Sequence, residues 1–267
     1  LGADSALGLP PHQLLPANTR TVVSVNSYAD AWRIDGGQGT GRDGITSAST
    51  GRVDAAAMKC GLTSNELAAP VTGPLMRAET LVDDGRPTEL LVARVDDPTE
   101  LLAAAERRFT ERRAAVREGA FNPARSRVYS WTDNHKIDRV AVHLWHQGHL
   151  ILTDDERAAG EVISRMVSER PSGLATEEAF SAVWDLVGWS EAEKGVTRFR
   201  IARPWLHEDK SPPPSGKAAP HRENYLFAQR QGLTGIRAIG GRARILADGE
   251  EHVEAVAYAP RPVQRSL

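Results

Sequence analysis

Three histidines fall within seven residues in the stretch AVHLWHQGHLILTDDE, residues 141–156. Its alternation of apolar and polar residues predicts two β-strands joined by the two-residue turn Gln147-Gly148. Such a hairpin places His146 opposite His149, with Cβ atoms about 4.5–5.5 Å apart, while His143 points to the other face because side chains alternate along a strand. Two imidazoles at this spacing could share a zinc ion or take part in acid–base chemistry.

A metal or catalytic site at this hairpin needs partners beyond the histidine pair. His135 could approach from the preceding loop, and Asp154 or Asp155 could act as a ligand or base, although none of them has a fixed spacing to the pair. If the protein is an enzyme, its catalytic candidates are therefore His135, His146, His149 and Asp154. The simpler interpretation places His146 and His149, neutral, at an exposed hairpin tip, so we expect no bound metal and no cofactor.

Other motifs for catalysis or phosphate binding are weak. Residues 39–44, GTGRDG, match the G-x-G-x-x-G pattern, but Asp35 and a pair of glycines precede them where a buried strand is required, and β-favouring residues follow. A mobile loop is the better interpretation. No G-x-S-x-G nucleophile elbow occurs. Cys60 is the only cysteine, which excludes an intrachain disulfide and a cysteine-based zinc cluster, and we expect it to be inert.

Basic residues concentrate toward the end of the chain. From Val196 onward there are 12 Lys and Arg against 7 Asp and Glu, an excess of +5 in a chain whose net charge is -2. Five arginines on predicted strands could contact phosphates without reading sequence; they are Arg198, Arg200, Arg237, Arg242 and Arg244. Aromatic residues are only 6% of the chain, so no base-stacking platform is predicted, and a solvated charged face is the alternative.

Strands and helices are expected in mixed order along the chain. The predicted strands are Thr21–Val25, 75–82, 88–95, 126–133, 138–145, 149–153, 196–205, 233–239, 242–247 and 251–258. One helix is predicted from Asp97-Pro98 onward for about 20 residues, with Leu101, Ala105, Phe109 and Val116 facing inward. Two more are predicted after the 153–156 capping box and after Thr176. Short helices are predicted at 53–62 and 224–231. Residues 35–51, rich in Gly, Ser and Thr, are predicted to be a loop.

This order predicts an α+β fold, mainly an antiparallel sheet built from several hairpins and packed with three to four helices. The expected organisation is an extended arm at 1–20, a core domain at 21–207, a proline-rich linker at 208–222, and a β-rich extension at 223–267 that packs on the core. No apolar run reaches the roughly 20 residues needed to span a bilayer, so we expect no membrane segment.

Three functions are compatible with the sequence. The first is a non-enzymatic structural or assembly subunit of a large complex, such as a viral capsid, because proline-rich and glycine-rich segments are often held by neighbouring subunits. The others are a histidine-dependent hydrolase or nuclease and a nucleic-acid-binding module. Expected partners are copies of the chain or other subunits, with nucleic acid as a second partner. A start at Leu1 suggests a processed product, located in the cytoplasm or within a virion.

Overall fold

The computed structural model describes residues 10–28, 45–82, 85–168, 173–185, 196–202, 235–246 and 250–260. Ten strands form one sheet in the order β10-β9-β8-β1-β2-β3-β7-β6-β5-β4, and every neighbouring pair is antiparallel. The strands are β1 (Thr19–Val25), β2 (Val71–Leu81), β3 (Pro87–Val95), β4 (Ala115–Glu118), β5 (Arg125–Thr132), β6 (Asp138–His146), β7 (His149–Thr153), β8 (Val196–Ala202), β9 (Ala238–Ile245) and β10 (Glu251–Tyr258).

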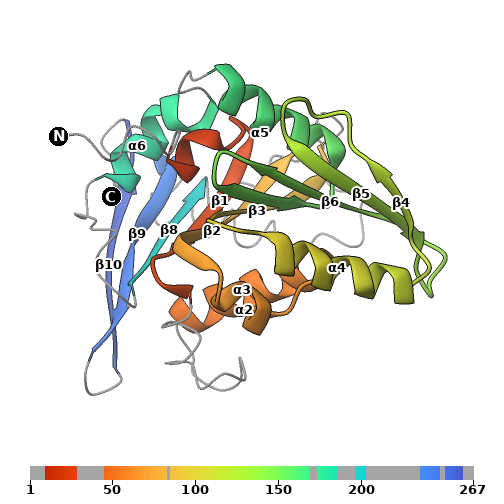
Figure 1. Ribbon diagram of the computed structural model, residues 1–267. Coiled ribbons are helices and arrows are strands. Elements are labelled where there is room, and N and C mark those ends of the chain that lie inside the picture. Colours follow the sequence, from red (N-terminus) through yellow and green to blue (C-terminus); the bar gives the residue numbers. More distant parts are fainter. Residues whose placement is uncertain are drawn as a thin grey trace, which may run out of the picture.

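Helices cover both faces of this sheet, which makes three layers (Figure 1). The helices are α2 (Ile45–Lys59), α3 (Ser64–Ala68), α4 (Thr99–Glu111), α5 (Glu156–Ser168) and α6 (Glu178–Trp184), with short 3-10 helices η2 (Pro11–Leu14) and η3 (Gly173–Thr176). α2, α3 and α4 pack on one face, here named the α2–α4 face. η2, α5, η3 and α6 pack on the other, the α5–α6 face.

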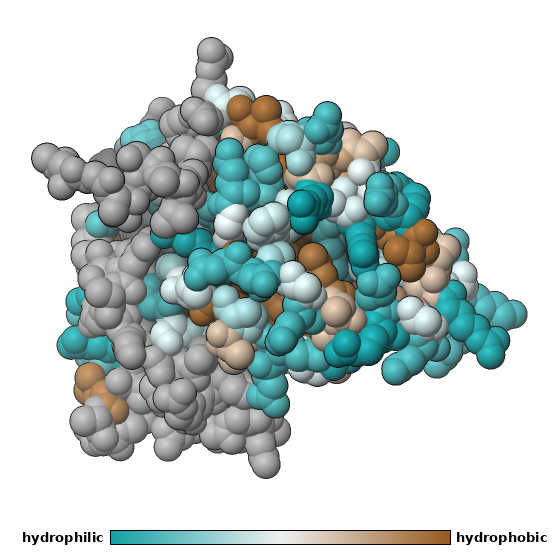
Figure 2. Space-filling view, in the orientation of Figure 1, coloured by the Kyte–Doolittle hydropathy of each residue, from teal (hydrophilic) through white to brown (hydrophobic). Residues whose placement is uncertain are grey.

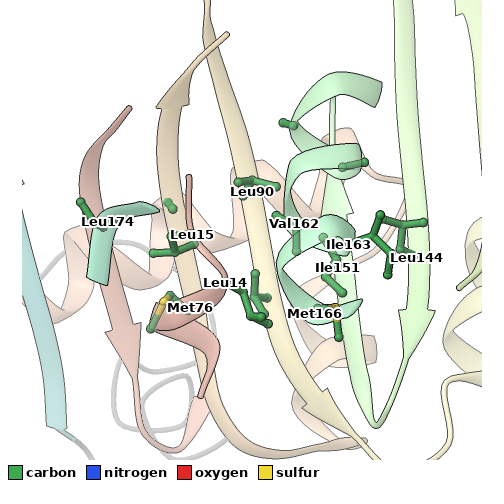
Figure 3. Packing of buried hydrophobic residues seen from close by; sticks show 14 of the residues in the cluster. Leu14, Leu15, Met76, Leu90, Leu144, Ile151, Val162, Ile163, Met166 and Leu174 are labelled. Atoms are coloured by element: carbon green, nitrogen blue, oxygen red, sulfur yellow. The ribbon is translucent and has the colours of Figure 1, made fainter. Parts of the chain in front are cut away.

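The central strands bury side chains on both of their faces. In β3, Leu90 and Val92 pack toward α5, while Leu91, Ala93 and Val95 pack toward α2 and α4. Figure 3 shows the first of these cores, in which Val162, Ile163 and Met166 of α5 lie close to Leu144 and Ile151 of the sheet. A strand buried on both faces is apolar at consecutive positions, which explains the runs LLVARV and HLILT.

Local sequence signals explain where two of the helices begin. The side-chain oxygen Oδ1 of Asp155 accepts the N–H groups of Arg157 and Ala158 at 2.8 and 3.2 Å, and so caps the start of α5. Asp97 accepts the N–H of Thr99 at 2.9 Å just before α4, whose N-cap is Pro98. The two helices begin close to the predicted signals at residues 97–100 and 153–156, but the predicted capping pairs do not form, because α4 begins one residue beyond Pro98 and the cap of α5 is Asp155 and not Thr153.

The mixed α+β class and the mainly antiparallel sheet are confirmed, and the strands form one sheet that is larger than the fold-class prediction of several hairpins. The described residues contain five α-helices rather than three or four, and a single ten-stranded sheet. Residues 45–51 belong to α2 and are not a loop. α4 is shorter than expected and ends at Glu111, so that Val116 lies in β4 and not on a helix.

The end of the chain also differs from the prediction. Residues 233–247 were expected to hold two strands, but one strand, β9, spans Ala238–Ile245. β9 and β10 extend the same sheet as β1 to β8, since β9 pairs with β8. Residues 1–9 of the predicted arm, the 224–231 helix and the whole 208–222 linker lie outside the described residues, whereas residues 10–20 hold η2 and the start of β1. The division into domains stays a prediction. None of the helices in the described ranges is long and apolar enough to span a bilayer.

Candidate functional site

The histidine hairpin forms with the predicted register. His146 pairs with His149, Trp145 with Leu150 and Leu144 with Ile151. The turn is tight, with positive φ at Gln147 (47°) and Gly148 (73°). His143 lies on the α2–α4 face, opposite to the other two histidines, as the alternation predicts.

His149 is not exposed as the simpler interpretation of the sequence expected. It is 1% exposed, and its Nδ1 lies 3.1 Å from the carbonyl of Gln147, whereas His146 is half-buried. Burial lowers the pKa of His149, and the nearby charges of Arg94 and His146 lower it further. The reason for this burial is that β7 is an inner strand, paired on its other side with Arg94 of β3.

A small pocket lies beside this buried imidazole. Its volume is about 230 Å³, and it is lined by Thr72, Gly73, Pro74, Arg94, Asp96, Gln147, Gly148 and His149. One buried imidazole, one guanidinium and one carboxylate therefore meet at the turn end of β3 and β7.

The other two catalytic candidates do not join the histidine pair. His135 lies in the β5–β6 turn, at the far end of β6 from His146, about 26 Å away at 3.3 Å per residue. Asp154 follows the far end of β7, about 17 Å from His149 by the same rise. Among the described residues no group of three or more His, Cys, Asp or Glu side chains is placed to hold a metal. The structure does not bring the catalytic candidates together at this hairpin, so a hydrolase activity there stays a prediction.

Asp154 belongs instead to a charged cluster at the C-terminal end of α2. It accepts the N–H of Glu89 at 3.0 Å, and Glu89 also contacts Lys59 at 3.1 Å and Arg77 at 3.2 Å. Burial raises the pKa of Asp154. Cys60 is buried beside this cluster, with Sγ 3.9 Å from the carbonyl of Thr153, and burial raises its pKa. It therefore remains a neutral thiol, which agrees with an inert cysteine.

Not all of the arginines that were predicted to form a basic surface are exposed. Arg198, Arg200, Arg242 and Arg244 occupy the same face of β8 and β9 by register. However, Arg200 is 1% exposed, and its guanidinium pairs with Glu177, donates to the carbonyl of Thr19 at 2.6 Å and lies over the ring of Phe180.

The other arginines of this set differ in their surroundings. Arg242 is held by Glu254, with its Nε 2.9 Å from Oε2. Arg237 is exposed just before β9, Arg244 is half-buried, and the side chain of Arg198 lies outside the described part of the structure. Arg200 cannot contact phosphates from its buried position, whereas binding of polyanions by the remaining arginines stays a prediction.

A larger pocket lies on the α2–α4 face, between α4 and strands β4, β5 and β6. We name it the α4 groove; its volume is about 610 Å³. It is lined by Thr99, Leu102, Ala103, Glu106, Glu118, Gly119, Ala124, Arg125, Ser126, Arg127, His143 and Trp145. This groove was not predicted from the sequence, because its walls come from four separate elements. The available signal was the hairpin register, which sets Arg125 opposite Trp145 and Arg127 opposite His143.

His143 forms part of the inner wall of this groove. It is 1% exposed and lies among aromatic rings, with centroids 5.0 Å from Tyr129 and 5.9 Å from Phe109. Its Nε2 lies 2.8 Å from the carbonyl of Cys60, which can only accept, so Nε2 carries the hydrogen and Nδ1 keeps a lone pair. Burial lowers the pKa of His143 to about 4, so the ring is neutral at pH 7.

The two edges of the sheet differ in length and in their contacts. β4 has four residues, and its Arg117 pairs with Glu156 of α5. β10 has eight residues, Glu251–Tyr258, without lysine or proline, and its register with β9 has no bulge. No strand among the described residues pairs with its outer edge. Short, charged edges resist pairing with another chain, whereas long regular ones permit it.

The face of the molecule in Figure 2 is mostly hydrophilic where it is described. Hydrophobic residues form small patches separated by hydrophilic ones, and one such patch lies at the end of the molecule where α4 adjoins β4 and β5. This face therefore offers no broad apolar surface, and the candidate sites are the α4 groove, the His149 pocket and the β10 edge. The G-x-G-x-x-G segment at 39–44 lies outside the described residues.

Comparison of the chain with protein-family models, with curated proteins and with solved structures found no match in any of the three searches.

Proposed function

We propose that the protein is a structural assembly subunit that joins a second copy of itself through the outer edge of β10. The observation that carries this proposal is the contrast between the two sheet edges, since β4 has only four residues whereas β10 has eight in a regular register with β9. Val253 on this strand is 40% exposed, and Ala255 and Ala257 are exposed as well. Pairing with another strand would cover part of this surface.

The backbone of β10 has donors that point away from β9. The N–H of Leu246 donates to the carbonyl of Glu250 at 2.8 Å, where the two strands meet. Antiparallel pairs alternate between hydrogen-bonded and non-bonded positions, and the β9–β10 register has no shift. The N–H groups of even-numbered β10 residues therefore point to β9, and those of Val253, Ala255 and Ala257 point outward.

A two-fold pairing of β10 with itself is chemically consistent. An edge-to-edge two-fold axis lies perpendicular to the sheet, so residues with outward N–H groups pair with one another. A pairing centred on Ala255 sets Val253 opposite Ala257 and Glu254 opposite Val256. No like charges are then directly opposed, whereas a centre at Glu254 would place two carboxylates together.

This contact alone produces a dimer, because a two-fold interface uses the same surface on both copies. A closed shell such as a viral capsid would need a further interface. The role of a capsid subunit is therefore a second proposal, which rests on the proposed pairing through β10.

Native mass spectrometry and sedimentation equilibrium over a range of protein concentrations test the proposal. We expect the wild type to associate, Ala255→Pro to dissociate because it loses an outward N–H group, and Ala255→Thr to associate because it keeps that group. Proline is tolerated where a strand's N–H faces away from the sheet, so the variant should stay folded. A wild type that remains monomeric at high concentration, or equal association of both variants, would contradict the proposal.

A further inference from the structure

The α4 groove has a helix for one wall and a sheet for the other. Thr99, Leu102, Ala103 and Glu106 line it from α4, at the spacing of a single helix face. Arg125 and Arg127 of β5 and His143 and Trp145 of β6 line it from the sheet. A volume of about 610 Å³ lies within the usual range for small-molecule sites.

Charges of both signs line this groove in equal number. Glu106 and Arg127 form an ion pair with each other across it. Among the described residues, Arg125 has no carboxylate partner, and its guanidinium lies 5.9 Å from the ring centroid of Trp145. Glu118 forms no ion pair within the described ranges, since Arg127, which lies opposite it, is paired with Glu106. One cation and one anion of the groove are therefore available to a ligand.

The backbone positions of these two residues guide the choice of a ligand whose charges they could bind together. Glu118 lies opposite Arg127, so Arg125, two residues along β5, is its diagonal neighbour. The Cα atoms of diagonal neighbours in an antiparallel pair of strands lie about 7–8 Å apart. A dipeptide or tripeptide with free ends has its ammonium and carboxylate at about this distance, since an extended chain spans about 3.3–3.6 Å per residue. The two charges of a single amino acid are too close together.

Among the buried polar atoms of the lining residues that have no partner in the described part of the chain, two belong to β6. They are Nδ1 of His143, which is a hydrogen-bond acceptor, and Nε1 of Trp145, which is a donor. A buried polar group without a partner is costly, so such atoms at the wall of a pocket indicate a ligand or an ordered water. A peptide group offers both complementary functions, an N–H donor and a C=O acceptor.

We propose that the α4 groove binds a short peptide of two or three residues with free termini. Its carboxylate pairs with Arg125 and its ammonium with Glu118, while its side chains lie against Leu102, Ala103 and the ring of Trp145. The peptide group lies over the wall that holds His143 and Trp145. This binding site is independent of the β10 edge, so it can be present or absent whatever the assembly state.

Calorimetric titration of the full chain with four related compounds tests the charge requirement. The probes are the dipeptide Leu-Leu, its N-acetyl derivative, its C-terminal amide and free leucine. We expect Leu-Leu to bind, and each of the other three to bind at least about tenfold more weakly, because each lacks one charge or the required separation. No binding of Leu-Leu at millimolar concentration, or equal binding of all four probes, would overturn the proposal.

Matched variants locate the site. Arg125→Gln and Glu118→Gln should each raise the Kd of Leu-Leu about tenfold, and Trp145→Phe should raise it several-fold because it keeps a ring and loses the donor. The controls are Arg107→Gln and Glu100→Gln, which change exposed charges on the other side of α4. Kd values that change equally in controls and groove variants would place the binding elsewhere and contradict the proposal.

Discussion

Buried polar side chains in this protein serve mainly to connect elements of the fold. His143 ties β6 to the end of α2 through the carbonyl of Cys60, and Arg200 ties β8 to α6 and to the start of β1. The sequence places both residues on the correct faces of their strands. It did not predict their burial, because exposure depends on which helix covers a strand and not on the strand itself.

The neutral state of His143 predicts a loss of stability in acid. Its pKa is about 4 in the folded protein and about 6.5 in the unfolded chain, so the unfolded chain binds the proton more readily. The stability from this group is complete above pH 6.5 and is lost as the pH falls through 4, by about 3 kcal/mol in total.

Urea unfolding at pH 7 and at pH 4 measures this effect. His143→Gln, which keeps an N–H donor for the carbonyl of Cys60, should lose less stability between the two pH values than the wild type. The pKa of His149 is also lowered, so only the difference between wild type and variant reports on His143. Identical losses in both proteins would contradict the assignment.

Two arginines of the predicted polyanion surface should differ strongly in their effect on stability. Arg200 is buried and Arg242 forms a partly exposed pair with Glu254. Removal of a buried partner leaves polar groups unsatisfied, so Arg200→Met should lower the free energy of unfolding by about 2–4 kcal/mol. Arg242→Met should lower it by less than about 1 kcal/mol. Thermal and urea unfolding measure both variants. Equal losses of unfolding free energy in Arg200→Met and Arg242→Met would contradict the burial of Arg200.

At the scale of single elements, hairpins were easier to predict than helices. The turns at Gly85 and at Gln147-Gly148 follow apolar runs that end in turn-forming residues, and both hairpins have the expected strands. The first half of α2 has the sequence ITSASTG. Its residues do not favour a helix, and they do not form the apolar stripe of an amphipathic helix. Its burial against the sheet, at Ser49, Thr50 and Val53, decides its structure, and that contact is not visible in local sequence.

Two glycines of the α2 region should respond oppositely to alanine. Gly61 ends α2 with φ of 73°, where its N–H donates to the carbonyl of Met58, and an added Cβ would lie 2.7 Å from the ring of Phe109. Gly51 lies inside α2, and an added Cβ would meet nothing within 4 Å. We expect Gly61→Ala to destabilise the protein by about 1–3 kcal/mol and Gly51→Ala to stabilise it by about 0.5–1 kcal/mol. Thermal unfolding measures both, and a stabilising Gly61→Ala would contradict the described helix end.

At the scale of the whole molecule, the strand order could not be derived from the sequence. β1 lies between β2 and β8, which are far apart along the chain, and β10 and β4 occupy the two edges (Figure 1). The runs LLVARV and HLILT indicate strands that are covered on both faces, but they do not indicate which helices cover them. The open edge exists only because of this order. The α4 groove was not predicted because residues 115–118, which form β4, were expected to continue the preceding helix.

Amide hydrogen exchange of β10 tests the assembly proposal most directly. If two copies pair along this edge, the outward N–H groups of Val253, Ala255 and Ala257 should exchange slowly at high protein concentration and faster on dilution, because they are bonded only in the dimer. The N–H groups of His252, Glu254 and Val256, which point to β9, should be protected at every concentration. Rapid exchange of the three outward groups at high concentration, with the inward groups protected, would contradict the account.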